Sequence, residues 1–217
     1  QGVALNTDYL IQDVKVNLQK KLDALTASIY EYTGELNLNS PSQVAIALYQ
    51  NLGIKQIDKK KPMSTDKRIL SKLKKEHPVI PLFLQFKSLS KLITAFVDKL
   101  PKNAVNDRIH TSFNTIGAKT GRMASNSPNL QQIPNADGGL IRKAFKANEG
   151  RLLASIDFSS QELRWLAHFS QDPVLNDIYM NDKDVHCMTA TSMWNLQHPD
   201  DEISYEFFEL CYRSYSK

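Results

Sequence analysis

The sequence predicts an α+β fold in which a helical first half precedes a part containing an incomplete antiparallel sheet. Two long apolar stripes with steps of three and four residues predict the helices of the first hundred residues. From Arg108 onward, alternating apolar residues and a later apolar run predict strands instead. A segment dense in Gly, Ser, Asn and Pro lies between them and predicts a loop.

The first stripe runs from Val14 to Ile29 and ends at Gly34, as expected of a helix that stops at a glycine. Ser40-Pro41-Ser42-Gln43 has the form of a capping box, and Gly53 closes the helix that it opens. Ser64-Thr65 is expected to cap a short helix that ends at the His77-Pro78 break. The second stripe begins at Leu82 and stops at Pro101.

In the second half, Ile109, Thr111 and Phe113 alternate as in a half-buried strand. Residues 117–135 are expected to form a loop. The run from Arg151 to Phe158 is interpreted as a buried strand, followed by a helix that opens at residues 159–162. Two shorter helices are predicted, one over 173–180 and one over 184–194.

Composition permits a soluble globular protein and excludes few classes. The 217 residues are enough for one domain or two unequal lobes. We find no run long enough to cross a bilayer and expect no leader segment. The two cysteines, Cys187 and Cys211, are too few for a disulfide framework, so reduced thiols in a cytoplasm are expected.

The net charge of +4 is modest, but the charges are unevenly distributed. A basic region lies in the first half: Lys55, Lys59, Lys60, Lys61, Lys67, Arg68, Lys72, Lys74 and Lys75. Acids gather near the end: Asp172, Asp177, Asp182, Asp184, Asp200, Asp201 and Glu202. This asymmetry fits a protein that binds phosphate in its first half, although a solvated helical face explains the lysines equally well.

Asp157 follows the apolar run and precedes a helix, a place from which a carboxylate can bind a divalent cation. An ordinary strand-end acid or helix cap is the simpler interpretation. Glu162 lies three residues after Ser159 and also completes a capping box. His186 and Cys187 have no partner at metal-ligand spacing, so a metal site there is not expected.

The loop from Arg122 to Gln132 concentrates amide side chains and an arginine. Amides can pair with minor-groove base edges, whose acceptors are nearly independent of sequence. Most such stretches are simply polar surface loops.

Taken together and in order, these stretches resemble the family A DNA polymerases, the DNA polymerase I type. The resemblance covers nearly the whole chain and is carried by 108–114, 120–122, 128–134, 141–145, 157–164 and 184–186, with 36–40 and 89–92 upstream. It implies a helical thumb and a partial palm. We expect a palm-associated segment over 1–20, the thumb over 21–105 and the partial palm over 106–217.

The resemblance also implies roles for individual residues. Asp157 would be one of two aspartates that bind Mg²⁺ in a two-metal site, with the Phe158 carbonyl as a further ligand. Glu162 would block a ribose 2′-hydroxyl and His186 would contact the incoming triphosphate. Nucleotide binding would also involve Phe158, Ser159, Ser160 and Gln161. Primer–template DNA would be bound by Asn39, Ser40, Ser64, Thr65, Lys87, Lys91, Arg122, Asn129, Gln131 and Gln132.

Departures from the family pattern are visible. The family has Tyr where Phe158 stands, Gln-Ile at Ser160-Gln161 and Asn at Gln132, and Ser160 puts one nucleotide contact in doubt. The resemblance further implies that the fingers helix and the second catalytic aspartate lie beyond Lys217. In-line transfer with two cations needs carboxylates on both sides of the metal pair. We therefore expect this chain alone not to extend primers.

Four alternatives remain at this point. The chain is a polymerase fragment acting on deoxynucleoside triphosphates, or half of a split polymerase whose fingers and palm are a separate chain. The third alternative is a non-catalytic duplex-binding module. The fourth is a relative of the phage RNA polymerases, and Glu162 argues against it because the side chain would collide with a ribose 2′-hydroxyl. No membrane partner is expected, and the location would be the cytoplasm of a bacterial or phage-infected cell.

Overall fold

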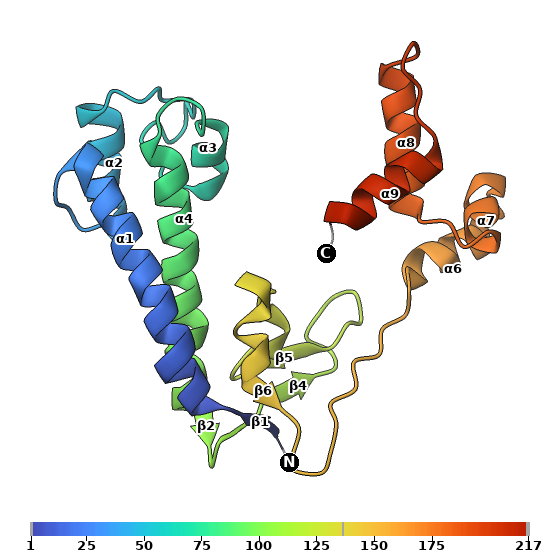
Figure 1. Ribbon diagram of the computed structural model, residues 1–217, viewed down its shortest axis with the longest axis horizontal. Coiled ribbons are helices and arrows are strands. Elements are labelled where there is room, and N and C mark those ends of the chain that lie inside the picture. The colour runs from blue at the N-terminus through green and yellow to red at the C-terminus, as the bar shows by residue number, and fades with distance from the viewer. Residues whose placement is uncertain (1, 136, 216–217) are drawn as a thin grey trace. The chain divides into compact units, whose positions relative to one another are not determined.

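A computed structural model describes residues 2–135 and 137–215, and the α+β prediction is confirmed (Figure 1). The chain divides into two compact units, Gln1–Leu153 and Ala154–Lys217. The first unit holds a helical subdomain and all the strands that the structure describes. The second unit holds helices only, within its described residues.

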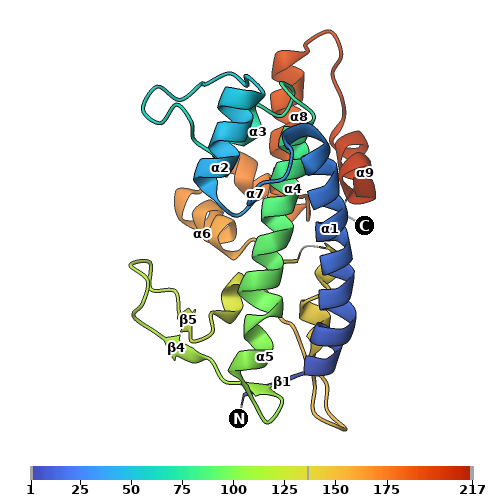
Figure 2. The same ribbon diagram turned by 90° about the vertical axis from the view of Figure 1, so that its left-hand side faces the viewer.

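The helical part of the first unit is built on two long helices that lie side by side (Figures 1 and 2). The first begins as a π-helical segment, Tyr9–Val14, and continues as α1, Lys15–Thr33. It ends where Gly34 adopts a positive φ of 69°, as the sequence predicts. The second comprises α4 (Val79–Leu92), a π-helical segment (Ile93–Val97) and α5 (Lys99–Asn103).

Two short helices cover one end of this pair. They are α2, Pro41–Ala45, which continues as a π-helical segment over Ile46–Asn51, and α3, Lys67–Lys72. Both were expected, but neither cap has the predicted form. Ser40 precedes α2 without a side-chain cap bond, and the Gln43 side chain instead accepts from Asn37 N at 2.8 Å. Asp66, not Ser64 or Thr65, directly precedes α3.

The helices α1 and α4 contribute apolar side chains to two buried clusters. The cluster near the sheet contains Leu18 of α1 and Leu89 of α4, together with Leu5 and Ile109 from strands. The cluster near α2 and α3 contains Ile29, Leu48, Leu70, Ile80 and Phe83. Because both long helices have residues in each cluster, they connect the packing around α2 and α3 to the packing around the sheet of this unit.

One sequence expectation about membranes needs correction. The continuous helix Val79–Asn103 is long and apolar enough to span a bilayer, by length and composition alone. Its apolar side chains, among them Ile80, Phe83 and Phe86, pack against α1, α2 and α3. A core helix passes the same test, so this helix is weak evidence for a membrane protein.

The sheet at the other end of the helices is small and entirely antiparallel. Its order is β2-β3-β1-β6, made of Ala104–Val105, Arg108–Ile109, Val3–Leu5 and Phe145–Lys146. β1 is central, with Val3 opposite Ile109 and Leu5 opposite Phe145. The first residues thus pair with strands more than a hundred positions later, which ties the start of the chain to the second half of the first unit.

A two-stranded ribbon and short 3₁₀ turns also belong to the described part of the first unit. β4 (Ser112–Asn114) pairs with β5 (Ala124–Asn126), with Phe113 opposite Ser125. The 3₁₀ segments among these residues are Leu130–Gln132, Asp137–Gly139 and Arg142–Ala144. The loop expected over 117–135 therefore contains a strand and a helical turn.

The second unit contains α6 (Gln161–Ser170), α7 (Pro173–Met180), α8 (Val185–Gln197) and α9 (Tyr205–Tyr215). The first three match predicted helices, and α9 was not predicted. The prediction of a strand over Arg151–Phe158 is wrong. These residues form irregular chain (Figure 1). Leu152 and Ile156 are 95% and 90% exposed. A strand needs a neighbour for its N–H and C=O groups, and the described residues offer none here.

Candidate functional site

Three of the six polar residues that the sequence singles out in the helical part line one cavity of about 210 Å³. Asn39 lies in the turn before α2, and Lys87 and Lys91 lie one turn apart on α4. Ser90 Oγ lies 3.4 Å from Asn39 Oδ1 and donates to it, which connects that turn to α4. The structure thus brings together three predicted DNA-binding residues that are up to 52 positions apart (91 − 39).

Lys87 links this cavity to the segment before α3. Its ammonium donates to the carbonyl of Thr65 at 3.0 Å and lies 5.5 Å from the centre of the Phe83 ring. Thr65 is itself buried, and Ser64 is half-buried. Four of the predicted residues, Asn39, Lys87, Lys91 and Thr65, therefore belong to one neighbourhood.

Tyr49 anchors the same segment and was missed by sequence reasoning. Its hydroxyl donates to Ser64 O at 2.6 Å, and burial raises the pKa of the phenol above its ordinary value of 10.0. The hydroxyl therefore stays protonated and remains a donor at neutral pH. No local signal marks this residue, because its partner is 15 positions away.

The segment to which Lys87 connects this cavity, through the Thr65 carbonyl, belongs to a basic stretch of the chain. All nine lysine and arginine side chains of the run between Lys55 and Lys75 are exposed. Ser40, at the start of α2, has its hydroxyl 3.2 Å from that of Ser42. Exposed cations of one stretch attract a polyanion such as a nucleic-acid backbone.

The amide-rich loop is held together by some of the side chains that were predicted to read DNA. Asn129 Oδ1 accepts from Gln131 N at 3.0 Å. The Gln131 amide accepts from Ser125 N at 3.1 Å and donates to Met123 O at 2.9 Å. Asn129 and Gln131 thus shape the loop through these bonds. The residues Arg122, Gln131 and Gln132 are exposed.

Asp157 lies at the end of the irregular, exposed segment and not at the rim of a sheet. The next residue, Phe158, lines an apolar cavity of about 520 Å³ whose other lining residues are Ser159, Gln161, Arg164, Trp165 and His168. Among the described residues, no group of three or more His, Cys, Asp or Glu side chains is placed to hold a metal ion. The carboxylate of Asp157 is an oxygen ligand of the kind that Mg²⁺ prefers, but it is a single one.

The start of α6 differs from a capping box. Ser160 adopts a positive φ of 51° and makes no side-chain cap bond, so neither Ser159 nor Ser160 caps the helix in the expected way. Arg164 donates from Nε to Ser159 O at 3.1 Å and stacks over the Tyr179 ring at 4.7 Å. Arg164 therefore fixes the turn that precedes Glu162 to α7.

His186 is exposed at the start of α8, where Asp184 caps the helix. A polar cavity of about 220 Å³ lies beside this start, and it is lined by Ser159, Ser160, Arg164, Tyr179, Asp182, Lys183, Asp184, Val185 and Glu209. The structure thus brings Ser159 and Ser160 close to the segment that carries His186. The DNA-binding candidates fall in the first unit and the nucleotide-binding candidates in the second.

Comparison with known proteins places these features in a family. A family model described as DNA polymerase family A matches residues 8–206. The DNA polymerase I of Synechocystis sp. is 41% identical over 88% of this chain, and the thermostable DNA polymerase I of Thermus filiformis is 38% identical over 90%. This chain spans 20% and 24% of those proteins, about one fifth to one quarter of their length.

A solved structure of a related polymerase domain is also similar to this chain. The POL domain of Pol1 from M. smegmatis, in complex with DNA primer-template and dNTP, superposes with a TM-score of 0.75 at 32% identity. The match covers 88% of this chain and 35% of that chain.

Proposed function

Because this chain belongs to DNA polymerase family A, we propose that it is the part of a DNA-directed DNA polymerase that holds primer–template DNA and supplies one metal-binding aspartate. The observation that carries this proposal is the cavity that gathers Asn39, Lys87 and Lys91. Ammonium and amide donors from two separate segments converge there, and Lys87 also connects the cavity to the segment after the basic run 55–61, as expected of a site that binds a phosphate backbone.

The proposed DNA grip has two parts. The first is formed by Asn39, Ser40, Ser64, Thr65, Lys87 and Lys91, in the thumb over 21–105. The second is formed by Arg122, Asn129, Gln131 and Gln132, in the partial palm over 106–217. Phosphate contacts fix the position of the duplex, and amide contacts in the minor groove tolerate any sequence, which a polymerase needs.

The proposed nucleotide site belongs to the second unit. Phe158, Ser159, Ser160, Gln161 and His186 would contact a deoxynucleoside triphosphate, and Glu162 would exclude a 2′-hydroxyl. The proximity of Ser159 and Ser160 to the start of α8 supports this grouping. Mg²⁺ would be held by Asp157 and the Phe158 carbonyl, and when bound it would offset the negative charge of the phosphates.

We propose that this chain alone does not extend primers. Two-metal phosphoryl transfer needs more than one carboxylate at the metal pair, and Asp157 supplies one. The missing groups would come from the remainder of the polymerase, in the same or a separate chain. Residues 1–20 would belong to the palm, consistent with the pairing of β1 with β3 and β6. By likeness to bacterial relatives, the location would be the cytoplasm.

Fluorescence anisotropy with a labelled primer–template tests the grip. The Lys87→Ala/Lys91→Ala variant should bind more weakly and with a shallower salt dependence. Lys20→Ala, which removes an exposed lysine of α1, is the control and should bind like the wild type. Equal affinity in all three proteins would exclude the proposed grip. Primer extension with Mg²⁺ and deoxynucleotides tests inactivity, and clear incorporation would refute it.

A non-catalytic duplex-binding module is the second candidate. It is favoured by the position of Asp157 in irregular, exposed chain. An NMR titration of the chain with Mn²⁺ and dATP distinguishes the two candidates. The polymerase proposal predicts paramagnetic broadening of the NMR signals near Asp157 that is lost in Asp157→Asn, whereas a pure duplex-binding module predicts no such broadening.

A further inference from the structure

The start of α8 is fixed by Asp184. Its Oδ1 accepts from the backbone N–H groups of His186 and Cys187 at 2.8 and 2.9 Å. The first N–H groups of a helix have no partner within the helix, so a capping carboxylate determines where the first turn lies. The position of the His186 side chain therefore depends on the position of Asp184.

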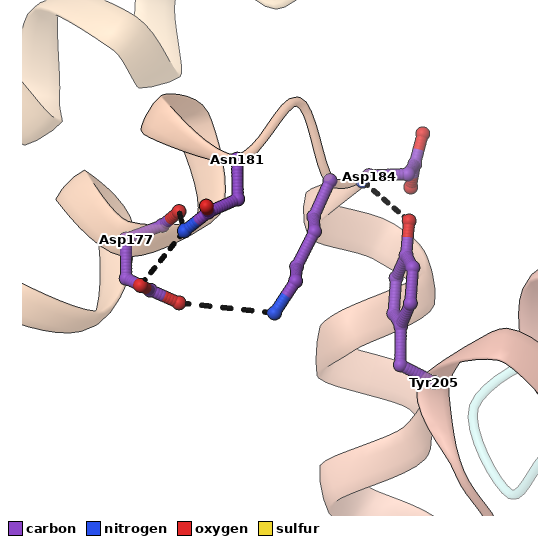
Figure 3. Close-up of polar contacts among 5 residues, drawn as sticks. Asp177, Asn181, Asp184 and Tyr205 are labelled. Atoms are coloured by element: carbon purple, nitrogen blue, oxygen red, sulfur yellow. Dashed lines mark hydrogen bonds and ion pairs between the residues drawn. The ribbon is translucent and has the colours of Figure 1, made fainter.

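Asp184 is in turn held by a tyrosine from the next helix (Figure 3). Its backbone N–H donates to the hydroxyl of Tyr205, the first residue of α9, at 2.8 Å. Burial raises the pKa of the Tyr205 phenol above 10.0, and a hydrogen bond to Glu209 raises it further, although the bond from Asp184 opposes both. The hydroxyl thus remains neutral and available as an acceptor at physiological pH.

The residue before Asp184, Lys183, makes contacts that also hold the connector between α7 and α8. The Lys183 ammonium lies 5.9 Å from the centre of the Tyr205 ring and 3.9 Å from Asp177 Oδ2. Asn181 Nδ2 donates to both the carbonyl and Oδ1 of Asp177 at 2.9 Å (Figure 3). The connector between α7 and α8 is therefore tied to α7 through Asp177 and to α9 through Tyr205.

We propose that Tyr205 is a positioning residue for His186. It acts through Asp184: the hydroxyl holds the Asp184 main chain, the Asp184 carboxylate holds the first turn of α8, and that turn presents His186 to the triphosphate of a deoxynucleotide. The inference rests on the proposed role of His186. It adds a residue from α9, 19 positions after His186 (205 − 186), whose own side chain does not contact the nucleotide.

The test compares Tyr205→Phe with Tyr30→Phe in the full chain. Each substitution removes one tyrosine hydroxyl that bonds to a backbone group, because the Tyr30 hydroxyl donates to Leu36 O at 2.9 Å in the first unit. The probe is dATP with Mg²⁺, measured by titration calorimetry. Tyr205→Phe should weaken binding roughly threefold to tenfold, the size expected for one net hydrogen bond. Tyr30→Phe should leave the affinity unchanged.

A double-mutant cycle separates positioning from a general structural role. In a His186→Ala background, Tyr205→Phe should cause no further loss of dATP affinity. The proposal is overturned if the loss persists there at the same size, or if Tyr205→Phe binds dATP as tightly as Tyr30→Phe does.

If the wild-type chain does not bind dATP, the proposed nucleotide site is refuted. Amide hydrogen exchange then still tests whether Tyr205 holds the start of α8. Exchange at Asp184, His186 and Cys187 should be faster in Tyr205→Phe than in the wild type and unchanged in Tyr30→Phe. Equal exchange at these three amides in both variants would show that Tyr205 does not hold the start of α8.

Discussion

Lys59, Lys60 and Lys61 form an exposed turn in the basic region near the proposed grip. The Asp58 carboxylate closes this turn by accepting from the main-chain N–H groups of Lys60 and Lys61 at 2.9 and 3.2 Å. Because both bonds use main-chain donors, replacing the three lysines by glutamine leaves the turn intact. The substitution therefore removes charge with little change of backbone structure.

The expected effect follows from counterion release. Each lysine that neutralises one phosphate of duplex DNA contributes about 0.9 to the slope of log affinity against log salt, so three contribute about 2.7. Over a fourfold rise in salt, from about 50 to about 200 mM, a slope of that size corresponds to a loss of about 40-fold in affinity. The Lys59→Gln/Lys60→Gln/Lys61→Gln variant should lack this part of the salt dependence.

Anisotropy titrations at four salt concentrations measure the slope. The control replaces three exposed lysines elsewhere, Lys20, Lys102 and Lys146, and removes the same net charge. If contact with phosphate matters, the first variant should have a much shallower slope than the control. Identical slopes for the two variants would show that only net charge acts, and a wild-type slope in the first variant would show that the turn does not touch DNA.

Three further predictions concern stability, each measured by urea or pH unfolding. Tyr49→Phe loses the bond to Ser64 O and should lower the unfolding free energy by about 1 kcal/mol, and an unchanged midpoint would contradict the anchoring role. Ile80→Ala opens a cavity in a buried cluster and should cost about 2–5 kcal/mol, whereas Ile116→Ala, at an 88% exposed position, should cost almost nothing. Hydrogen bonds from its own backbone N–H and from Ser204 lower the pKa of Glu206, so its contribution to stability is present above about pH 4.5 and is lost as the pH falls through the lower folded value. Glu206→Gln should lose that part of the pH dependence of the unfolding free energy. The same loss of stability at low pH in the variant and the wild type would contradict this role of Glu206.

Helices were predictable wherever a local pattern sufficed. The stripe from Val14 to Ile29 and the glycine stop at Gly34 depend on residues close in sequence, and both occur as predicted. The capping box at Ser40 failed because Gln43 found a partner at Asn37 instead of the helix start. Helix existence is thus encoded locally, whereas the partner of a polar side chain depends on what the fold places beside it.

The candidate site divides in the same way. The resemblance implied DNA-binding roles for Asn39, Lys87 and Lys91. Their convergence on one cavity depends on the packing of the turn before α2 against α4. Tyr49 and Tyr205 could not be predicted, because each bonds to a main-chain group at least 15 positions away. A hydroxyl that bonds to a backbone atom constrains only one of the two residue types, so the sequence carries no paired signal.

The segment from Arg151 to Phe158 shows why an apolar run does not determine a strand by itself. Leu152, Leu153 and Ile156 have the apolar character of a buried strand, yet each is at least 60% exposed. A strand gains its hydrogen bonds only from a neighbour, and its apolar side chains gain stability only against a covering layer. In the described sheet, β6 is an edge strand and pairs with no strand from this segment. An apolar run with neither a pairing strand nor a covering layer therefore stays irregular, whatever its residue types predict.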